Sequence, residues 1–593
     1  MNHKPNSKVV KKGVFSYVFE GTLKISCRCT MDPEEILSHV GSLGRYQKLI
    51  VALLCLPIFL ATCHVYLQVF AAGKSDHWCK SWVNDDCPTD LLDDVDFNCE
   101  DFKKSMSIPI IIDEYNSTKY DQCTKYDVSG IDLQTAIDLG DDVTKLEVIP
   151  CDEGWEYDRS TFPSTIIQDF ELVCGMSYLP NIAQSVYFVG YMVGSALPGV
   201  TADLIGRRWT FLLCASFITL TGIANTFSLN VWMFIALRFL TAVFGKGINL
   251  VCFIIVVEIV APSKRVMVSN LMWVAFAVAY FALAALAKTI PNWRILQLVV
   301  SIPYLPILVL AIIFLPETPR WLLSKQRFAS AEKILRRMAK FNGKELPENF
   351  SKEISSCNEN DNEQSGIKTV IRQLLGSRTL LLITVNMNLN WIVQSLVYYG
   401  LSLSTSSLGV DPYIAFCISG TIEIPAYILC MFIPEWFGRK LSTSVTMVAA
   451  GVCCCVTPLI PLGIWRALVA MSGKFFITIS FSVVYNWGSE LLPTTIRSSG
   501  MGFFSMISRV GSITAPIILL LENVWPNLPV LVFGACSILA GIFCLVMPET
   551  KGKPLPNTIQ DTKALYRNSQ PVEMKQAPEK ETTDSQPNSK NVV

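Results

Sequence analysis

The chain has 593 residues, of which 51% are hydrophobic and only 17% are charged, and its 49 Lys and Arg residues balance 49 Asp and Glu residues. Soluble globular domains usually carry about 25% charged residues, so this composition excludes an ordinary soluble protein. A chain without net positive charge also gives no reason to expect a nucleic-acid partner.

Residues 1–48 form a basic arm ahead of the first long apolar run. That run begins only near Leu49, so no cleavable signal peptide is visible. We expect the arm to stay on the cytoplasmic side of a membrane.

Apolar stretches of about 20 residues, long enough to cross a bilayer as helices, occur twelve times. Unbroken apolar runs do not alternate as the strands of a membrane barrel do, which favours helices. The sequence predicts an all-α membrane protein of two six-helix halves, residues 49–315 and 378–550. The spans lie near residues 49–70, 182–200, 210–226, 231–257, 267–286, 295–314, 380–401, 412–432, 442–462, 465–487, 501–521 and 528–547.

The long segment 73–178 separates the first two spans and holds 24 Asp and Glu against 8 Lys and Arg. Its six cysteines, an even number, predict three disulfides in an oxidising extracellular space, with the pairing left open. Zinc binding is the rival reading, but the spacings contain no CxxC pair. Asn116 begins a glycosylation sequon in the same segment. The cysteines are Cys79, Cys87, Cys99, Cys123, Cys151 and Cys174.

Two polar segments complete the chain. The linker 316–377 contains apolar residues at helical spacing among basic ones, which predicts an amphipathic helix at the cytoplasmic face. Those apolar residues are Phe328, Ala331, Ile334, Leu335 and Met338. The tail 551–593 is rich in Lys, Gln, Ser, Pro and Asn and is expected to be disordered.

The short loops give the orientation. If twelve spans are counted, the basic loop residues share one side with both termini, and positive loops mark the cytoplasm. We therefore expect a multi-pass plasma-membrane protein with both termini cytoplasmic. The basic loop residues include Arg207, Arg208, Lys264, Arg265, Arg439, Lys440 and Arg497.

The second half repeats the charged residues of the first at a constant offset. Asp203, Glu258 and Glu317 recur as Glu435, Glu490 and Glu549, each 232 positions later. A second set, which includes Arg238 and Lys246, recurs 228 positions later as Arg466 and Lys474. Such alignment of charges indicates two copies of one unit.

Charged residues at mid-membrane depth are candidates for substrate binding, because each costs several kcal/mol unless it is paired or faces water. They are Lys246, Glu423, Lys474 and Arg509. The alternative is internal pairing, for instance of Glu423 with Arg509 or Lys474. Aromatic and amide residues lie at helical spacing with them and suit an ammonium group, although ordinary helix packing also explains them. These are Trp391, Gln394, Tyr398, Tyr399, Gln184, Tyr187 and Tyr485.

Several motifs together point to a family. Gly199-x3-Asp203-x2-Gly206-Arg207-Arg208 resembles the motif of the major facilitator superfamily, and Pro316-Glu317-Thr318-Pro319-Arg320-Trp321-Leu322 resembles that of its sugar-porter-like members. With the cysteine-rich segment, Tyr398-Tyr399-Gly400-Leu401 and Glu423-Ile424-Pro425-Ala426-Tyr427, the chain resembles the organic cation/carnitine/organic anion transporter family from Met31 to Pro556.

The resemblance implies the major facilitator fold and alternating access, with a gating network at the cytosolic helix ends. The alternative is that these charges only fix topology. The implied gate residues are Asp203, Arg207, Arg208, Glu258, Arg265, Glu317, Arg320, Glu435, Arg439, Lys440, Glu490, Arg497 and Glu549.

The resemblance also bears on the sign of the substrate. Glu423 and Tyr427 are similar to the cation and carnitine branches, whereas Arg509 is similar to the carnitine and anion branches. A zwitterion would fit this mixture, with its ammonium near Glu423 and its carboxylate near Arg509.

We therefore expect a polyspecific secondary transporter of small organic cations or zwitterions such as carnitine-like quaternary ammonium compounds. An organic anion exchanger and a non-transporting receptor or scaffold on the same fold remain alternatives. No enzyme motif is visible outside the spans. No cofactor or metal is expected, and a coupling ion, Na+ or H+, and the oligomeric state stay open.

Overall fold

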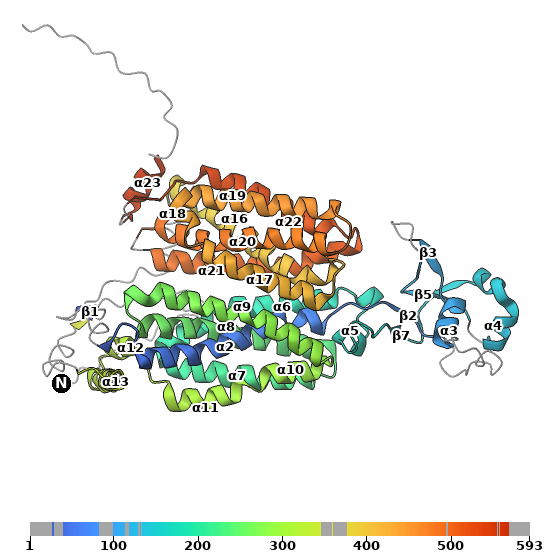
Figure 1. The fold of residues 1–593 in the computed structure, drawn as a ribbon, viewed down its shortest axis with the longest axis horizontal. Helices are drawn as coiled ribbons and strands as arrows, with labels where there is room; N and C mark the ends of the chain where they lie inside the picture. The colour runs from blue at the N-terminus through green and yellow to red at the C-terminus, as the bar shows by residue number, and fades with distance from the viewer. Residues whose placement is uncertain are drawn as a thin grey trace, which may run out of the picture.

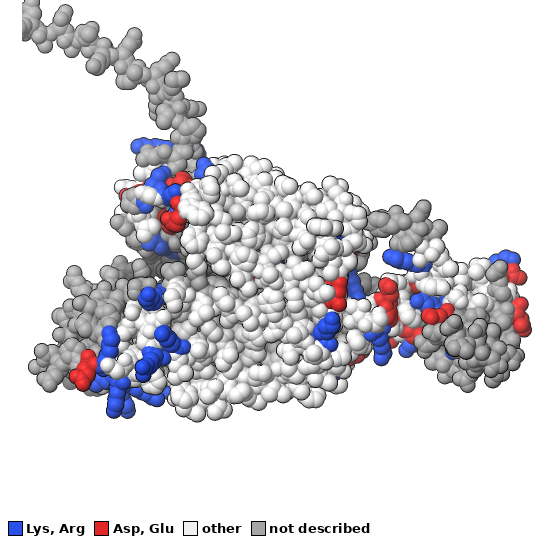
Figure 2. All heavy atoms as spheres, viewed as in Figure 1, with Lys and Arg blue, Asp and Glu red and all other residues white. Residues whose placement is uncertain are grey.

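The computed structural model describes residues 27–28, 40–81, 99–112, 118–128, 131, 133–345, 358–359, 376–493, 496–553, 555–556 and 558–567. Within these residues, twelve helical spans are long and apolar enough to cross a membrane, which confirms the predicted number. Side chains on their outer faces are apolar and exposed, for example Leu220, Trp232 and Val385. Figure 2 shows the result as a broad uncharged surface on the face of the bundle turned to the viewer.

The first half is built from α2 (Arg45–Ala71), α6 (Leu179–Ile205), α7 (Arg207–Thr226), α8 (Val231–Ile259), α9 (Pro262–Thr289), α10 (Trp293–Ser301) and α11 (Tyr304–Phe314). The sequence predicts one unbroken sixth span over 295–314, but the structure divides it into α10 and α11. Pro303 precedes α11 and has no backbone N–H to donate, which accounts for the break.

The second half consists of α16 (Arg378–Leu403), α17 (Pro412–Leu429), α19 (Arg439–Val456), α20 (Ile464–Leu491), α21 (Arg497–Leu519) and α22 (Leu528–Phe543), with the short α18 (Ile433–Phe437) before α19. The two halves lie side by side with their helices running in the same general direction (Figure 1). They meet where α6 packs on α21 and α9 packs on α17. These four helices thus form the main interface between the halves.

One end of the bundle, which we call the motif end, carries α12 (Pro319–Ser324), α13 (Phe328–Phe341) and α23 (Ile559–Arg567) (Figure 1). The apolar face of α13 buries Ala331, Leu335 and Met338. The sequence predicts a disordered tail from residue 551 onward, and this is wrong for Ile559–Arg567. Ile559, Leu565 and Tyr566 pack against the core of the second half, so α23 has an apolar face to bury.

A separate module extends from the opposite end of the bundle (Figure 1). It contains α3 (Cys99–Ser107), α4 (Leu133–Leu139), α5 (Ile166–Asp169) and three antiparallel strand pairs. The pairs are β2 (His77–Cys79) with β7 (Trp155–Tyr157), β3 (Ile110–Ile112) with β4 (Thr118–Tyr120), and β5 (Thr124–Tyr126) with β6 (Val148–Pro150). At the motif end, β1 (Cys27–Arg28) pairs with β8 (Asn358–Glu359).

Disulfides link the strands of this cysteine module. Cys79 bonds to Cys151, and Cys123 bonds to Cys174. Of the two other predicted disulfide residues, Cys87 lies outside the described residues, and the side chain of Cys99 is not described. The sequon residue Asn116 also lies outside the described residues. Each described bond closes a loop of more than 50 residues, which restricts the unfolded chain strongly.

We expect the four bonded cysteines to resist a membrane-impermeant maleimide in intact cells until a reductant is added, because a disulfide sulfur has no thiolate to react. The measurement is labelling of the surface protein with and without reduction. Cys79→Ser is the internal control, since it frees Cys151 and should permit labelling without reductant. Labelling of the unreduced wild-type chain at these positions would contradict the pairing.

Candidate substrate site and charge networks

A buried ion pair joins two helices of the second half. Lys474 on α20 places its Nζ 2.8 Å from Oε1 of Glu423 on α17, and both side chains have 0% exposure. The Tyr398 hydroxyl donates to the same Oε1 at 2.7 Å, and the Tyr427 hydroxyl lies 3.5 Å from Oε2. Glu423 is therefore paired with Lys474, one of the two partners that the sequence suggested for internal pairing.

Lys474 also reaches the first half. Its ammonium donates to the hydroxyls of Ser419 at 2.6 Å and Tyr280 at 3.2 Å, and Tyr280 belongs to α9. With Glu423, these contacts provide an acceptor for each of the three N–H groups of the ammonium. The charge of Lys474 is thus satisfied by the protein, and Tyr280 joins it to the other half.

Aromatic rings surround this pair and close the interface between the halves. The Tyr280 ring lies 4.7 Å from Tyr66 and 4.8 Å from Phe416, measured between centroids. Nearer the motif end, Trp273 of α9 stacks on Tyr427 of α17 at 5.9 Å. The ion pair is therefore enclosed by rings contributed by both halves.

Two further cations approach one ring. The Lys246 ammonium lies 5.6 Å from the centre of the Tyr191 ring, and the Arg509 guanidinium lies 5.9 Å from it. Lys246 and Tyr191 belong to the first half, whereas Arg509 belongs to α21 of the second. Among the described residues no carboxylate forms an ion pair with Lys246 or Arg509, and Arg509 Nε is buried without a hydrogen-bond partner. We call Lys246, Tyr191 and Arg509 the cation pair site.

The charges of the two groups differ. Glu423 and Lys474 cancel one another, whereas no described carboxylate forms an ion pair with either cation of the cation pair site. A buried charge without a counter-charge is costly. The site is therefore suited to a ligand that brings a negative group.

The remaining candidates from the second half divide between packing and exposure. Gln394 donates to the Ser480 hydroxyl at 3.0 Å inside the bundle, and Trp391 is buried, with its ring 5.1 Å from Tyr485. Tyr485 itself is half exposed, and Tyr399 lies 4.6 Å from Phe188 of the first half. Tyr399 thus lies at the interface between the halves, close to Arg509.

The candidates of α6 form a different buried group. Arg238 donates to Oε1 of Gln184 and to the His64 carbonyl, both at 2.9 Å, and lies 4.3 Å above the Tyr187 ring. This group lies within the first half and holds α2, α6 and α8 together. Gln184 and Tyr187 thus contact Arg238, whereas Tyr191 lies at the cation pair site.

Sequence reasoning missed Tyr280, Ser419, Trp273 and Tyr191. Tyr191 could have been found, since it follows Tyr187 by one helical turn and so lies on the same face. The contact of Tyr280 with Lys474 joins positions 194 residues apart. No local pattern indicates such a pair.

The contacts between the halves extend to the cysteine-module end. The Tyr413 ring of α17 stacks on Phe70 of α2 at 5.2 Å, and its hydroxyl lies 3.4 Å from the Thr161 carbonyl. Lys74 and Glu522, both partly exposed, form an ion pair at 3.4 Å. These contacts join the halves at that end of the bundle.

The motif end carries a charge network in the first half. Arg207 lies 3.0 Å from both Asp203 Oδ1 and Glu258 Oε1, and the Thr318 hydroxyl donates to Glu258 at 2.5 Å. The second half repeats it: Arg439 pairs with Glu435 at 2.9 Å and Glu490 at 3.1 Å, and Thr550 donates to Glu490 at 2.6 Å. The repeated sequence thus produces a repeated network.

The network also caps the following helix in each half. Glu317 accepts the first two backbone N–H groups of α7 at 2.8 and 3.2 Å, and Glu549 does the same for α19 at 2.9 and 3.0 Å. A carboxylate is stabilised there by the helix dipole. Gly206 and Gly438 have φ of +107° and +84°, and a Cβ at either would collide with the capping carboxylate.

The other predicted gate residues lie around these networks. Arg265 and Arg497 donate to carbonyls at the ends of α8 and α20, and Arg208 donates to a carbonyl of α11 at 2.8 Å. Arg320 and the Lys440 ammonium form no ion pair within the described part of the chain. Every described ion pair of both networks joins residues of one half.

Loosening one network should change turnover more than apparent affinity, because these groups do not contact the cation pair site and can only bias which conformation is populated. Glu490→Gln removes the charge that pairs with Arg439. We expect turnover to change roughly tenfold, the size of one charged hydrogen bond, with KM changed by less than about twofold.

The measurement is the kinetics of uptake normalised to surface protein. Glu522→Gln is the matched control, since this exposed pair lies at the opposite end and should change neither quantity measurably. A loss of substrate binding in proportion to transport would contradict the gating role.

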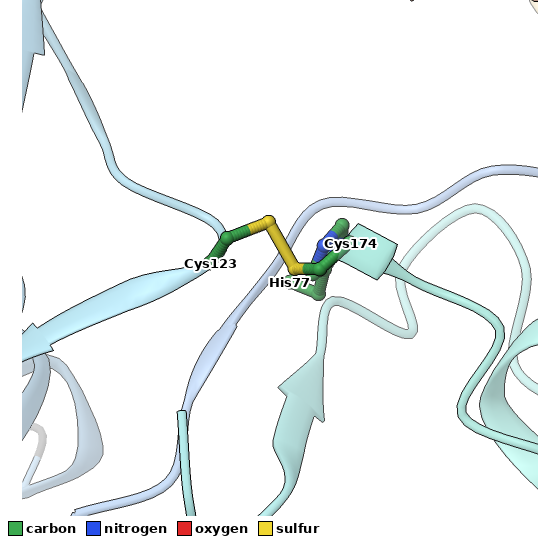
Figure 3. A group of neighbouring side chains, drawn as sticks. All are labelled: His77, Cys123 and Cys174. Carbon is green, nitrogen blue, oxygen red and sulfur yellow. A yellow bond between two sulfur atoms is a disulfide. The ribbon is translucent and has the colours of Figure 1, made fainter. Parts of the chain in front are cut away.

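One cluster has metal-ligand residue types. His77, Cys123 and Cys174 place their ligand atoms within 4.8 Å of one another. Figure 3 shows that the two sulfurs are bonded to each other beside the imidazole. They are therefore not available as thiolate ligands, and burial lowers the pKa of His77, which keeps its ring neutral. This group is a disulfide packed on a histidine.

Comparison with known proteins identifies relatives over most of the chain. Residues 155–560 match the pattern of the family "Sugar (and other) transporter". The chain is similar to solute carrier family 22 member 6-B of Xenopus laevis, with 32% identity over 93% of this chain and 98% of that protein. It is likewise 32% identical to solute carrier family 22 member 3 of Rattus norvegicus, covering 90% and 96% of the two chains.

A third relative and a solved structure complete the comparison. The beta-alanine transporter of Drosophila melanogaster is 32% identical over 90% of each chain. The inward-open structure of the xylose transporter XylE from E. coli has a TM-score of 0.51 at 19% identity and covers 66% of this chain and 90% of that one. At that identity the likeness concerns the fold, two six-helix halves, alone.

Proposed function

Because this chain belongs to solute carrier family 22 within the sugar (and other) transporter family of the major facilitator superfamily, we propose that it carries small zwitterions with an ammonium and a carboxylate group across the plasma membrane. Its relatives are transporters rather than enzymes, and the chain is a transporter of small organic substrates. The finer assignment rests on the charges of the site.

The cation pair site is the observation that carries the proposal. Glu423 is paired with Lys474, while Lys246 and Arg509 face one ring and have no carboxylate partner among the described residues. A substrate carboxylate placed between these cations would neutralise them, and a guanidinium can bind it through two parallel hydrogen bonds. A simple cation would instead meet two like charges.

The aromatic residues support the other end of a zwitterion. Tyr399 and Phe188, one from each half, lie next to the cation pair site. The faces of such rings attract ammonium groups. The Drosophila relative is a transporter of beta-alanine, a zwitterion with one amine and one carboxylate.

An organic anion is the second candidate, because the net charge of the unpaired groups is positive. The carboxylate of an organic anion would pair with Lys246 and Arg509 equally well, but the anion has no ammonium group to contact the aromatic rings. The two candidates differ only in whether a positive group improves binding.

Uptake of four labelled compounds in one expression system tests the proposal: beta-alanine, carnitine, tetraethylammonium and p-aminohippurate. We expect the two zwitterions to be transported best, and the assay with Na+ replaced and with external pH varied identifies a coupling ion. Preferential p-aminohippurate uptake would favour the anion candidate, and preferential tetraethylammonium uptake would contradict both. A surface-expressed chain that carries none of the four would favour a receptor or scaffold.

A further inference from the structure

α13 lies across the motif end with its axis roughly perpendicular to the spans, so that Figure 1 shows it end-on. Its position is fixed by contacts with the start of α2. The Asn342 side chain, just after α13, accepts from the Tyr46 backbone N–H and donates to the Val40 carbonyl, both at 2.9 Å. Phe341 packs edge-on against Tyr46 at 5.7 Å. The helix is therefore held parallel to the membrane plane, at the level where the spans end.

The face of α13 opposite its buried side is basic. Lys333, Arg337 and Lys340 recur at intervals of three or four residues, which places them on one stripe of the helix, and Lys344 follows just after the helix ends. All four are exposed, and none of them forms an ion pair among the described residues. The acidic Glu332 lies beside this stripe and pairs with Arg336 at 2.8 Å. The stripe therefore has no counter-charge supplied by its own helix.

The surroundings of the stripe are typical of a membrane boundary. Figure 2 shows basic side chains gathered at this corner of the molecule, next to the uncharged surface. Exposed apolar side chains belong to the same end, namely Phe341, Trp209, Leu204 and Ile205. Large aromatic residues beside Lys and Arg are characteristic of the level of the lipid headgroups. The stripe thus lies within reach of the headgroups of one leaflet.

We propose that the basic stripe of α13 binds the headgroups of anionic lipids in the inner leaflet. The proposal rests on the orientation expected from the positive loops, which puts the motif end in the cytoplasm, and it does not depend on the substrate. Anionic lipids enrich that leaflet, and each Lys or Arg near its surface contributes about 1 kcal/mol of attraction. Because α13 packs on α2 and follows α12, a lipid bound here would contact the same end of the bundle that holds both charge networks.

The test compares lipid binding to the purified full-length chain by native mass spectrometry. The chain is released from mixed micelles that contain phosphatidylserine and phosphatidylcholine at equal amounts. We expect the wild-type chain to retain phosphatidylserine preferentially. The variant R337Q/K340Q should lose that preference by roughly thirtyfold, because it removes two charges at the surface.

The matched control is K563Q/R567Q, which removes two exposed cations from α23 at the same end of the molecule. It should bind phosphatidylserine as the wild-type chain does, and the melting temperatures of all three proteins should agree. Equal losses in both variants would show a general effect of charge and overturn the proposal. So would equal retention of the two lipids by the wild-type chain. Neither outcome would touch the proposed substrate, since no substrate is present.

Discussion

Replacing Arg509 by lysine is expected to weaken the uptake of carboxylate-bearing substrates by about tenfold while leaving tetraethylammonium uptake nearly unchanged. Lysine keeps the positive charge beside Tyr191 but loses the planar fork that can hold a carboxylate through two hydrogen bonds. One charged hydrogen bond contributes about 1.5–3 kcal/mol, which sets the expected size. Arg509→Asp should go further and favour plain cations over zwitterions.

The measurement is a pair of uptake curves, for carnitine and tetraethylammonium, normalised to surface protein. Arg466→Lys is the matched control, because Arg466 is also buried in the second half but donates to Asn527 away from the cation pair site. Any loss in this control should affect both substrates by the same factor. If Arg509→Lys reduced both substrates equally, Arg509 would be a structural residue and the zwitterion proposal would lose its main support.

Replacing Glu423 by glutamine is expected to destabilise the protein and to abolish the transport of every substrate class. The substitution leaves the Lys474 ammonium at 0% exposure without its carboxylate. Removing one partner of a buried ion pair typically costs about 3–5 kcal/mol, because the other charge stays buried. The sequence alone suggests that Glu423→Gln reduces transport of cationic and zwitterionic substrates only, because it does not reveal that Glu423 forms an ion pair with Lys474.

The double variant E423Q/K474Q separates a structural pair from a substrate ligand. It removes both charges, so the melting temperature in detergent should recover most of what Glu423→Gln loses. Glu522→Gln serves as the control for loss of a carboxylate from a partly exposed pair and should leave the melting temperature nearly unchanged. A Glu423→Gln protein as stable as the wild type would show that Lys474 does not depend on this carboxylate.

The two predictions concern groups that lie near one another but act differently. The Glu423–Lys474 pair is satisfied within the protein and reaches the first half through Tyr280. The cation pair site also joins the two halves, yet no carboxylate in the described part of the chain pairs with its cations. A substrate that neutralises Lys246 and Arg509 together would thus favour conformations in which the two halves are close. That coupling is what alternating access requires of a ligand.

The amino-acid sequence by itself determined the architecture of this protein. Because a bilayer accepts only segments whose backbone groups are satisfied internally, apolar runs of sufficient length give the number of spans directly. The charge networks were also predictable in large part. Asp203 and Arg207, and likewise Glu435 and Arg439, are four residues apart, and helix geometry brings such residues together. The constant offset of 232 positions then extends the same contacts to the second half.

Only the tertiary structure decided which buried charges pair and which stay unpaired. The sequence offers Glu423 two cationic partners and gives no local reason to prefer either. Helix packing brings Lys474 to 2.8 Å from it and leaves Arg509 beside Tyr191 and Lys246 instead. The same packing supplies Tyr280 from the other half, which no spacing rule connects to Lys474. Contacts between residues of one helix follow from the helical repeat. Contacts between residues of different helices depend on how the helices pack. The charge of the candidate site is set by contacts between helices.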